Sequence, residues 1–454
     1  MNEKNYPTNN NSESGKRRAF ITLVKLALPA IVQQMLGSLL QYVDTAMVGH
    51  LGAAATATVS TSTSVNWLVH SLPSGFAIGL LSLLSQAYGR GDKDEMKRLS
   101  ALGCRLVLIL GIVITAICLG VSPFLPTWMQ ADPSIRKDAS AYFFIVSIPL
   151  IFFVSNSVFA SSMHAVKDTR TPMIVNLSAN VLNVVLNYLF IYKLSLGTYG
   201  AAYATALSTA AGGAGMFIAY RSKEELRVSL RDILKRDRAL LEKVLRVAMP
   251  VTGTTVVSCL GYIAFSGMVN GMGVTTFAAH AIAVNAEEIF YLPGYGIRTA
   301  TSALIGIAIG ERDQRKFLDI RQVSLLFTVV LMVLSGAALY FVAYPLMGFF
   351  TNDEAVVSMG AQVLKLVAFI EPFFGLMVAW EGISYGTGRT RSVFVIEACS
   401  MWGVRILCTW LVIRAGYGLN EVWLCMMADN IVKAVALTVY GLTHPVDVNT
   451  SRAV

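Results

Sequence analysis

Charged residues are scarce in this chain. They make up 14% of its 454 residues, whereas hydrophobic residues make up 55%; an average soluble domain is roughly 25% charged. This composition argues against a water-soluble protein of two to four globular domains, the number that the length would otherwise suggest. The long hydrophobic runs instead predict an all-α polytopic membrane protein, because each membrane span needs about 20 apolar residues.

Paired cysteines and metal-ligand motifs are absent from the sequence. The histidines His70, His164 and His280 are widely spaced and form no metal-ligand pattern. All six cysteines lie within hydrophobic runs, without a CxxC pair: Cys104, Cys118, Cys259, Cys399, Cys408 and Cys425. We expect them to be reduced core residues, and we expect neither a bound metal nor a cofactor other than a coupling ion.

Positive charge is plentiful, and most of it lies in short links between the hydrophobic runs. Lys and Arg number 36 against 27 acidic residues, for a net charge of +9. Basic clusters follow every second run, at Arg90–Arg98, Lys167–Arg170, Arg221–Arg246, Arg312–Lys316 and Arg389–Arg391. This placement excludes a nucleic-acid partner. It predicts cytoplasmic loops beside anionic lipid in the inner or plasma membrane, with both termini cytoplasmic.

The hydrophobic runs predict twelve transmembrane helices. They begin near residues 20, 59, 101, 140, 172, 199, 241, 276, 321, 358, 393 and 420. The first run, from about Phe20 to Val48, is longer than the apolar region of a cleavable signal, which spans about 7 to 15 residues. Residues 1–18 are therefore expected to form a cytoplasmic tail before a retained first span.

An internal repeat divides the chain. MVGHLG at 47–52 matches MVNGMG at 268–273, AYGRGD ending at Asp92 matches AIGERD ending at Asp313, and Pro29 matches Pro250. The number of residues between the two members is the same in every pair, and we call it the repeat offset. We expect two six-helix halves at 19–220 and 241–442, a cytoplasmic linker at 221–240 and a cytoplasmic tail at 443–454. Because six is even, the repeats are parallel, an arrangement typical of secondary transporters with a central cavity.

Several motifs resemble those of the multidrug and toxic compound extrusion (MATE) family. They are VDTAMVGHLG at 43–52, SQAYGRGD at the end of the second span and KDTRTPM at 167–173, and the resemblance covers about residues 20–440. It implies a V-shaped, twelve-helix antiporter, not an enzyme. Such a protein exports amphipathic, often cationic organic compounds in exchange for Na⁺ or H⁺. Its partners would be small molecules and the bilayer, and we expect a monomer.

Asp44 is the first candidate functional residue. A carboxylate within an apolar helix usually marks an ion or substrate pathway, although it could also form a structural hydrogen bond between helices. Gln34, Ser38, Gln41 and Thr45 follow one another at steps of four, three and four, so these polar groups share a helix face with Asp44.

A stripe of four asparagines occupies the fifth span. Asn176, Asn180, Asn183 and Asn187 are four, three and four residues apart, so they share a face that interhelical hydrogen bonds could use. The resemblance implies that Asp44, Asn183, Asn187 and Thr205 bind the coupling ion and form a candidate Na⁺ site. The family often has an aspartate where this chain has Asn187. In the second half, the repeat-equivalent positions of Asp44, Asn183 and Asn187 are Phe265, Val404 and Cys408. These three side chains cannot coordinate a cation.

The second half carries its acids elsewhere. Glu288 and Glu371, with Gln34 and Gln41 of the first half, are candidates for substrate or proton binding, and a related form with a single glutamate favours Glu288 over Glu287. Glu371 precedes Pro372, where a helix break is expected. The alternative for these glutamates is a buried pair with Arg298 or Arg405.

Glu381 is expected near the cytoplasmic end, where it could snorkel. Asp429 and Lys433 have the spacing of a helical ion pair.

Two other functions compete with drug export. A flippase for lipid-linked precursors should line its cavity with several Lys and Arg, whereas the charges near the middle of these spans are mostly acidic. An intramembrane enzyme should carry a clustered DxxxD or HExxH motif, and neither occurs in the sequence.

Overall fold

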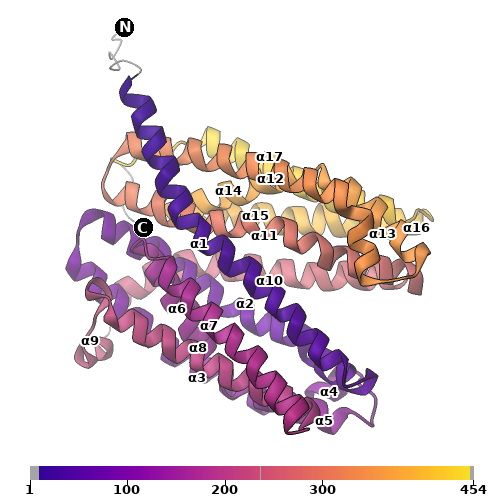
Figure 1. Cartoon of the computed structure of the whole chain (residues 1–454). Coiled ribbons are helices and arrows are strands. Elements are labelled where there is room, and N and C mark those ends of the chain that lie inside the picture. Colours follow the sequence, from indigo (N-terminus) through magenta and orange to yellow (C-terminus); the bar gives the residue numbers. More distant parts are fainter. Residues whose placement is uncertain (1–9, 236, 450–454) are drawn as a thin grey trace. The chain divides into compact units, whose positions relative to one another are not determined.

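The computed structural model describes residues 10–235 and 237–449, and every regular element in these ranges is a helix (Figure 1). Residues 1–9 and 450–454, which belong to the two expected tails, lie outside the described residues. The chain divides into two compact units. We call the described part of residues 32–87 and 92–259 the N-bundle, and the described part of residues 1–31, 88–91 and 260–454 the C-bundle.

The N-bundle is built from helices that follow one another with short links. Its elements are α2 (Ala53–Arg90), α3 (Lys93–Val121), α4 (Leu125–Trp128), α5 (Arg136–Ser147), α6 (Leu150–Ala165), α7 (Arg170–Asn187), η1 (Tyr188–Lys193), α8 (Gly197–Ser222), η2 (Glu224–Leu226) and α9 (Leu230–Leu234). Helices α5 and α6 meet at a bend of 43°, beside Pro149, which lacks the N–H needed to continue the helix.

The C-bundle has a corresponding series. Its elements are α11 (Val274–Gly310), α12 (Gln314–Phe350), α13 (Glu354–Ala368), α14 (Glu371–Thr387), α15 (Thr390–Ser400), η3 (Met401–Ile406), α16 (Leu407–Arg414) and α17 (Leu419–Thr443). Helices α13 and α14 are bent by 54°. The bend lies immediately before Glu371 and Pro372, which confirms the predicted helix break.

The remaining helices, α1 (Asn10–Gly49) and α10 (Arg238–Asn270), contribute to both units, and the last three residues of α2 belong to the C-bundle. Within the C-bundle, a Cβ added to Gly296 of α11 would lie 2.7 Å from the backbone nitrogen of Ile31 on α1. Within the N-bundle, a Cβ on Gly75 of α2 would lie 2.7 Å from the backbone nitrogen of Thr252 on α10. Both glycines, and both of their partners, are related by the repeat offset. Glycine is required at each crossing because a side chain would prevent this close helix approach.

The turns between helices recur at the same offset. Four pairs of repeat-equivalent residues share a left-handed backbone, with φ between 51° and 114°: Gly52 and Gly273, Gly91 and Arg312, Lys167 and Gly388, Ser195 and Gly416. The repeated AYGRGD and AIGERD motifs each end in a helix cap. The carboxylates of Asp92 and Asp313 each accept the N–H of the third residue on at 2.9 Å, which satisfies a free donor of α3 and of α12.

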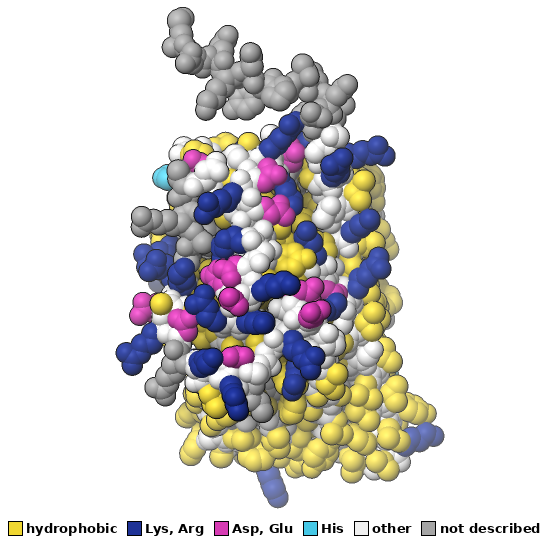
Figure 2. All heavy atoms as spheres, turned by 90° about the vertical axis from the view of Figure 1, so that its left-hand side faces the viewer, with side chains coloured by type: hydrophobic (Ala, Val, Ile, Leu, Met, Phe, Trp, Pro, Cys, Tyr) yellow, Lys and Arg dark blue, Asp and Glu magenta, His cyan; other side chains and the backbone are white. Residues whose placement is uncertain are grey.

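Eight helices of the described chain are long and apolar enough to cross a membrane, or ten if each bent pair is one span. Helix α11 is outside this set; it carries Glu287, Glu288 and Arg298 in its sequence. In Figure 2, Lys, Arg and acidic side chains gather over the face turned to the viewer, and hydrophobic side chains cover the surface beside it. The protein is therefore a multi-pass membrane protein.

The cysteines correct one part of the sequence interpretation. All six are free, and Cys104, Cys118, Cys259 and Cys425 are buried as predicted. Cys399 is exposed and Cys408 is half-buried, so the prediction that all six are core residues was wrong. In a membrane helix an apolar run need not be interior, because lipid solvates an outward-facing thiol as well as the protein core does.

Candidate functional site

The four residues expected to bind the coupling ion lie together within the N-bundle. Asp44 on α1 accepts a hydrogen bond at Oδ1 from Nδ2 of Asn187, the last residue of α7. The same Nδ2 donates to Oδ1 of Asn183, one turn earlier on α7, at 3.1 Å. A carboxylate and two amides from two helices therefore form one hydrogen-bonded chain.

Helix α8 completes this chain with hydroxyl groups. Asn183 donates through Nδ2 to Oγ1 of Thr205 at 3.5 Å and to Oγ of Ser208 at 3.2 Å. Ser208 was not predicted from the sequence. Its position three residues after Thr205 is the signal that could have found it, because residues at that spacing share a helix face. We call Asp44, Asn183, Asn187, Thr205 and Ser208 the polar cluster.

The polar cluster is rich in oxygen acceptors and poor in positive charge. Asn187 is fully buried, and its Oδ1 atom is buried without a hydrogen-bond partner. Asp44 is half-buried, and within the described residues no Lys or Arg side chain reaches ion-pair distance, 4.0 Å, of its carboxylate. An uncompensated carboxylate among neutral oxygens can take up a proton or a hard cation such as Na⁺.

The local backbone helps to place Asn187. Helix α7 ends there, and the chain continues directly into the π-helical segment η1. Short π-helical stretches are frequent at functional sites because they rotate the following side chains relative to the helix before them. The polar cluster lies at this change of helical geometry.

The other members of the asparagine stripe pack between helices, as the sequence predicted. Asn176 accepts a hydrogen bond from Asn156 at 2.6 Å and donates to the carbonyl of Pro172 at 2.9 Å. The Nδ2 atom of Asn180 lies 3.9 Å from where a Cβ of Gly37 would be. Gln34 and Gln41, the substrate candidates on α1, have exposed side chains and are not part of the polar cluster.

The candidate glutamates of the C-bundle differ in how deeply they are buried. Glu371, at the start of α14, is 2% exposed, and neither of its carboxylate oxygens has a hydrogen-bond partner. On α11 the buried carboxylate is Glu287, whereas Glu288 is half-buried. Successive residues point about 100° apart on a helix, so the motif alone could not tell which of the two faces inward.

A buried network of ion pairs lies elsewhere in the C-bundle. Asp429 of α17 accepts from Nε of Arg405 at 2.9 Å and lies 3.1 Å from Nζ of Lys433. Lys433 also pairs with Glu397 of α15 at 2.9 Å, and Ser400 donates to Asp429 at 2.6 Å. The predicted Asp429–Lys433 pair is confirmed. The sequence interpretation missed Glu397, although an acid inside a hydrophobic run was a sufficient signal.

Glu381 also belongs to a buried pair. Its carboxylate lies 2.5 Å from Nη1 of Arg298, and the residue is 4% exposed. The expectation that Glu381 snorkels toward the membrane edge was therefore wrong. Arg298 neutralises it in place, and the guanidinium of Arg298 lies over the ring of Tyr295 at 4.4 Å, so both charges are satisfied within the bundle.

Comparison with known proteins identifies the family. The family model MatE matches the chain twice, over residues 29–189 and 250–411. The chain belongs to the MatE family. The starts of the two matches differ by the same offset as the motif pairs and the paired turns. Members of this family are multidrug efflux transporters of membranes.

Curated MatE relatives span nearly the same length. A probable multidrug resistance protein NorM from Thermotoga maritima is 25% identical over 426 residues, which are 93% of this chain and 92% of the relative. A protein of the same name from Geobacillus kaustophilus is 26% identical over 392 residues, or 84% of this chain and 85% of the relative.

Solved MatE-type structures share the fold. A variant of the MATE transporter VcmN from Vibrio cholerae has a TM-score of 0.89 at 17% identity, covering 95% of this chain and 99% of that chain. A MOP superfamily transporter from Pyrococcus furiosus has a TM-score of 0.87 at 22% identity, covering 96% and 98%. This likeness extends over essentially the whole MatE chain, including both bundles.

Proposed function

We propose that this MatE protein is a secondary antiporter that exports amphipathic, often cationic organic compounds in exchange for Na⁺ or H⁺. The observation that carries the proposal is the polar cluster, in which the Asp44 carboxylate bonds to Asn187 within a membrane bundle and has no basic partner at ion-pair distance among the described residues. A lone charge in that setting is unfavourable unless a cation or proton joins it. It therefore supplies a site whose occupancy can change during transport.

The oxygens of the polar cluster fit a coupling cation. Asp44 supplies the charged ligand, and the buried Oδ1 of Asn187 supplies a neutral carbonyl oxygen that lacks a donor. Thr205 and Ser208 supply hydroxyl oxygens nearby. Na⁺ prefers such hard oxygen ligands, as other hard cations do. The hydrogen bond from Asn187 uses only Oδ1 of Asp44, so Oδ2 of the carboxylate is left for a cation.

We assign the finer architecture in the same proposal. Counting α8 and α11 with the eight helices and two bent pairs gives twelve spans, in two six-helix halves at 19–220 and 241–442 joined by the linker at 221–240. The paired turns and the double family match share the repeat offset and support this assignment. Both termini and the linker would then be cytoplasmic in the inner or plasma membrane, and the functional unit would be a monomer.

The second half would serve the substrate. Glu371 is a buried carboxylate whose oxygens accept no hydrogen bond in the described chain, and Glu288 is half-buried. A carboxylate can attract an organic cation or exchange a proton. Gln34 and Gln41 are exposed polar side chains on the helix that carries Asp44. Ion and substrate binding would favour different arrangements of the protein, which supplies the differential affinity that exchange requires.

The buried basic residues count against a flippase. A site for a lipid pyrophosphate needs free Arg or Lys charge, but Arg298, Arg405 and Lys433 are each paired with a carboxylate. The family and its curated relatives are transporters, which supports transport over intramembrane catalysis.

The test is drug-dependent ion flux in proteoliposomes, with Na⁺ and pH gradients imposed separately. Asp44→Asn keeps the size of the side chain and removes the charge, so ion-driven export should be abolished while the protein still folds. Glu288→Gln should change substrate affinity or selectivity and keep ion dependence. Full ion-driven export by Asp44→Asn at equal expression would sink the assignment of the ion site. Loss of ion dependence in Glu288→Gln alone would move the site to the C-bundle.

A further inference from the structure

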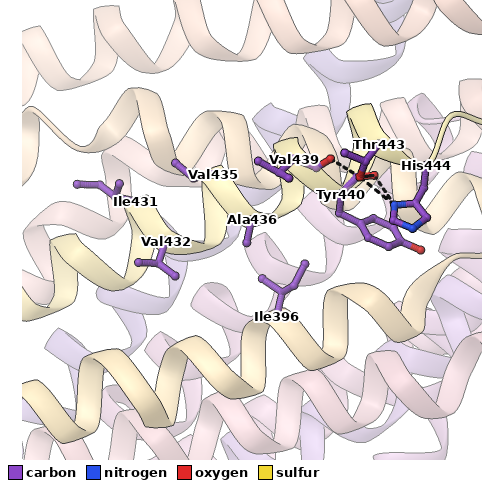
Figure 3. A pocket seen from close by; sticks show the side chains of 9 residues that line it. All are labelled: Ile396, Ile431, Val432, Val435, Ala436, Val439, Tyr440, Thr443 and His444. Atoms are coloured by element: carbon purple, nitrogen blue, oxygen red, sulfur yellow. Dashed lines mark hydrogen bonds between the residues drawn. The ribbon is translucent and has the colours of Figure 1, made fainter.

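An apolar groove runs along the C-bundle between α15 and α17 (Figure 3). It has a volume of about 640 Å³ and is lined by Ile396 of α15 and by one face of α17, from Ile431 through Val439. Val435 and Val439 are 50% and 54% exposed. Asp429 and Lys433 of the same helix are buried in the ion-pair network and do not line the groove.

The length of the groove matches one half of a bilayer. It extends from Ile431 to Thr443 along α17, and twelve residues at 1.5 Å each give about 18 Å. The hydrocarbon core of a bilayer is about 30 Å thick, so one leaflet is about 15 Å. The groove is thus long enough for one acyl chain that enters from the membrane edge.

One end of the groove is polar and held by hydrogen bonds. Nη1 of Arg389 donates to the backbone carbonyl of His444 at 2.6 Å, and the ring of His444 stacks on Tyr440 with centroids 4.5 Å apart. The Oγ1 atom of Thr443 lies 2.9 Å from Nδ1 of His444. Tyr440, Thr443 and His444 all line the groove, as Figure 3 shows. A guanidinium is therefore hydrogen-bonded to a residue at the end of the apolar groove.

The segment after α17 is also held in place. Gln314, at the start of α12, donates to the carbonyl of Val446 at 3.0 Å and accepts from the N–H of Val448 at 2.9 Å. Val448 is buried. Arg391 is exposed beside Arg389, and Asp447 is the acidic residue of this segment. The net charge of these three ionisable side chains is positive, so an anionic group is favoured there.

We propose that this groove binds an anionic phospholipid. One acyl chain lies along α17, and the phosphate is held by Arg389 together with the His444 ring. Phosphate is a strong hydrogen-bond acceptor, and a guanidinium is the side chain best suited to it. The site is separate from the polar cluster of the N-bundle and does not depend on which ion or drug the protein carries.

A second groove supplies a control within the same chain. It lies between α3 and α6, has a volume of about 240 Å³ and is lined by Ile112, Thr115, Ala116, Leu119 and Ile151. No charged side chain is among these lining residues. It can accommodate hydrocarbon, and its one polar lining side chain is the uncharged Thr115, so lipid bound there should not depend on the headgroup charge.

The experiment measures thermal unfolding and native mass spectra of the purified full chain in detergent. Phosphatidylglycerol and phosphatidylcholine with identical acyl chains are added separately. A ligand that binds the folded state raises Tm, so phosphatidylglycerol should raise it more than phosphatidylcholine and should remain bound in the spectrum. Arg389→Gln should remove the difference between the two lipids, and Ala436→Trp, which fills the groove, should remove the bound lipid.

Two matched variants complete the test. Arg391→Gln removes the neighbouring exposed charge, and Ala116→Trp fills the groove between α3 and α6; both should keep the selective lipid response. Equal Tm shifts with the two lipids in the wild type would overturn the proposal, as would an unchanged response in Ala436→Trp. If Ala436→Trp does not fold, Arg389→Gln decides by itself in the mass spectrum. A dimer that dissociates in Ala436→Trp, with no lipid bound to the wild type, would show a protein interface instead.

Discussion

Asp44 and Asp429 are both carboxylates within membrane helices, but their surroundings differ. Asp44 in the N-bundle bonds to an amide and has no cation at ion-pair distance in the described chain. Asp429 in the C-bundle lies against Arg405 and Lys433 and accepts a third bond from Ser400. One carboxylate is incomplete without an added cation, and the other is complete within the fold. The first therefore suits coupling, and the second suits architecture.

Disrupting the ion-pair network of Asp429 should have the largest effect on stability. Asp429→Asn leaves Arg405 and the Asp429-facing side of Lys433 without their countercharge in a buried setting, and removing one partner of such a pair costs about 3–5 kcal/mol. Asp44→Asn should leave the free energy of unfolding nearly unchanged. Denaturant unfolding in detergent measures both. Equal losses in the two variants would remove the distinction between a coupling and a structural carboxylate.

Within the N-bundle, Asn187 of the polar cluster and Asn176, which packs between helices, should differ in their effect on ion dependence. Asn187→Ala removes an oxygen of the polar cluster and should weaken the Na⁺ or H⁺ dependence of export about 10- to 100-fold, the range typical of groups that support a bound ion. Asn176→Ala, in the same stripe but bonded to Asn156, is the matched control and should retain the wild-type ion dependence. The measurement is initial export rate against ion concentration. A larger effect for Asn176→Ala would misplace the site.

The two glycine crossings should respond alike. A methyl group at Gly75 or Gly296 would meet backbone atoms at 2.7 Å, and overpacking of this kind costs about 1–3 kcal/mol. Gly120→Ala is the control because a Cβ there meets nothing within 4 Å; it should be neutral or slightly stabilising, as alanine favours helix. Thermal unfolding of the three variants tests this. A harmless change at only one crossing would show that the two are not equivalent.

The smallest expected effect concerns a link outside the spans. Burial raises the pKa of Asp168, but hydrogen bonds from Lys223 and Thr171 together lower it by more, so its pKa lies below the ordinary value. The charged form therefore stabilises the fold above the unfolded-state pKa of about 4, and this stabilisation is lost as pH falls through the folded-state pKa. The pair is partly exposed and should contribute less than about 1 kcal/mol.

The pH dependence of unfolding between about pH 5 and 3 checks this sign. The wild type should lose stability more steeply than Asp168→Asn as the pH falls. Glu224→Gln, an exposed neighbour of Lys223, should follow the wild-type curve. A steeper loss in Asp168→Asn than in the wild type would reverse the inferred direction of the pKa shift.

The sequence predicted local features well because they depend on helical spacing. Asn183 and Asn187 are one turn apart, and the structure places them together with Asp44. Pairings that cross between helices were harder to predict. Glu397 meets Lys433 from another helix, and nothing in the spacing of the two indicates this contact. Adjacent glutamates posed a related difficulty, since the rotation of α11 about its axis decides which of Glu287 and Glu288 is buried.

The division of α1 and α10 between the two bundles could not be predicted either. The repeat suggested that each half forms its own bundle, and the division of the chain shows otherwise at both α1 and α10. Hydropathy identifies a span but carries no information on the partner against which it packs. The glycines at 75 and 296 were visible in the sequence, but only the structure shows which helix approaches each of them.

The division of α1 and α10 between the two bundles has a consequence for synthesis. The N-bundle lacks part of its packing surface until the ribosome has made α10 up to residue 259, and the first part of α1 has no complete partner until residue 296 of α11 has been made. At about 5–20 residues per second, residues 31 and 296 are separated by roughly 13–50 s of translation. The first part of α1 is therefore made well before the C-bundle residues that complete its packing.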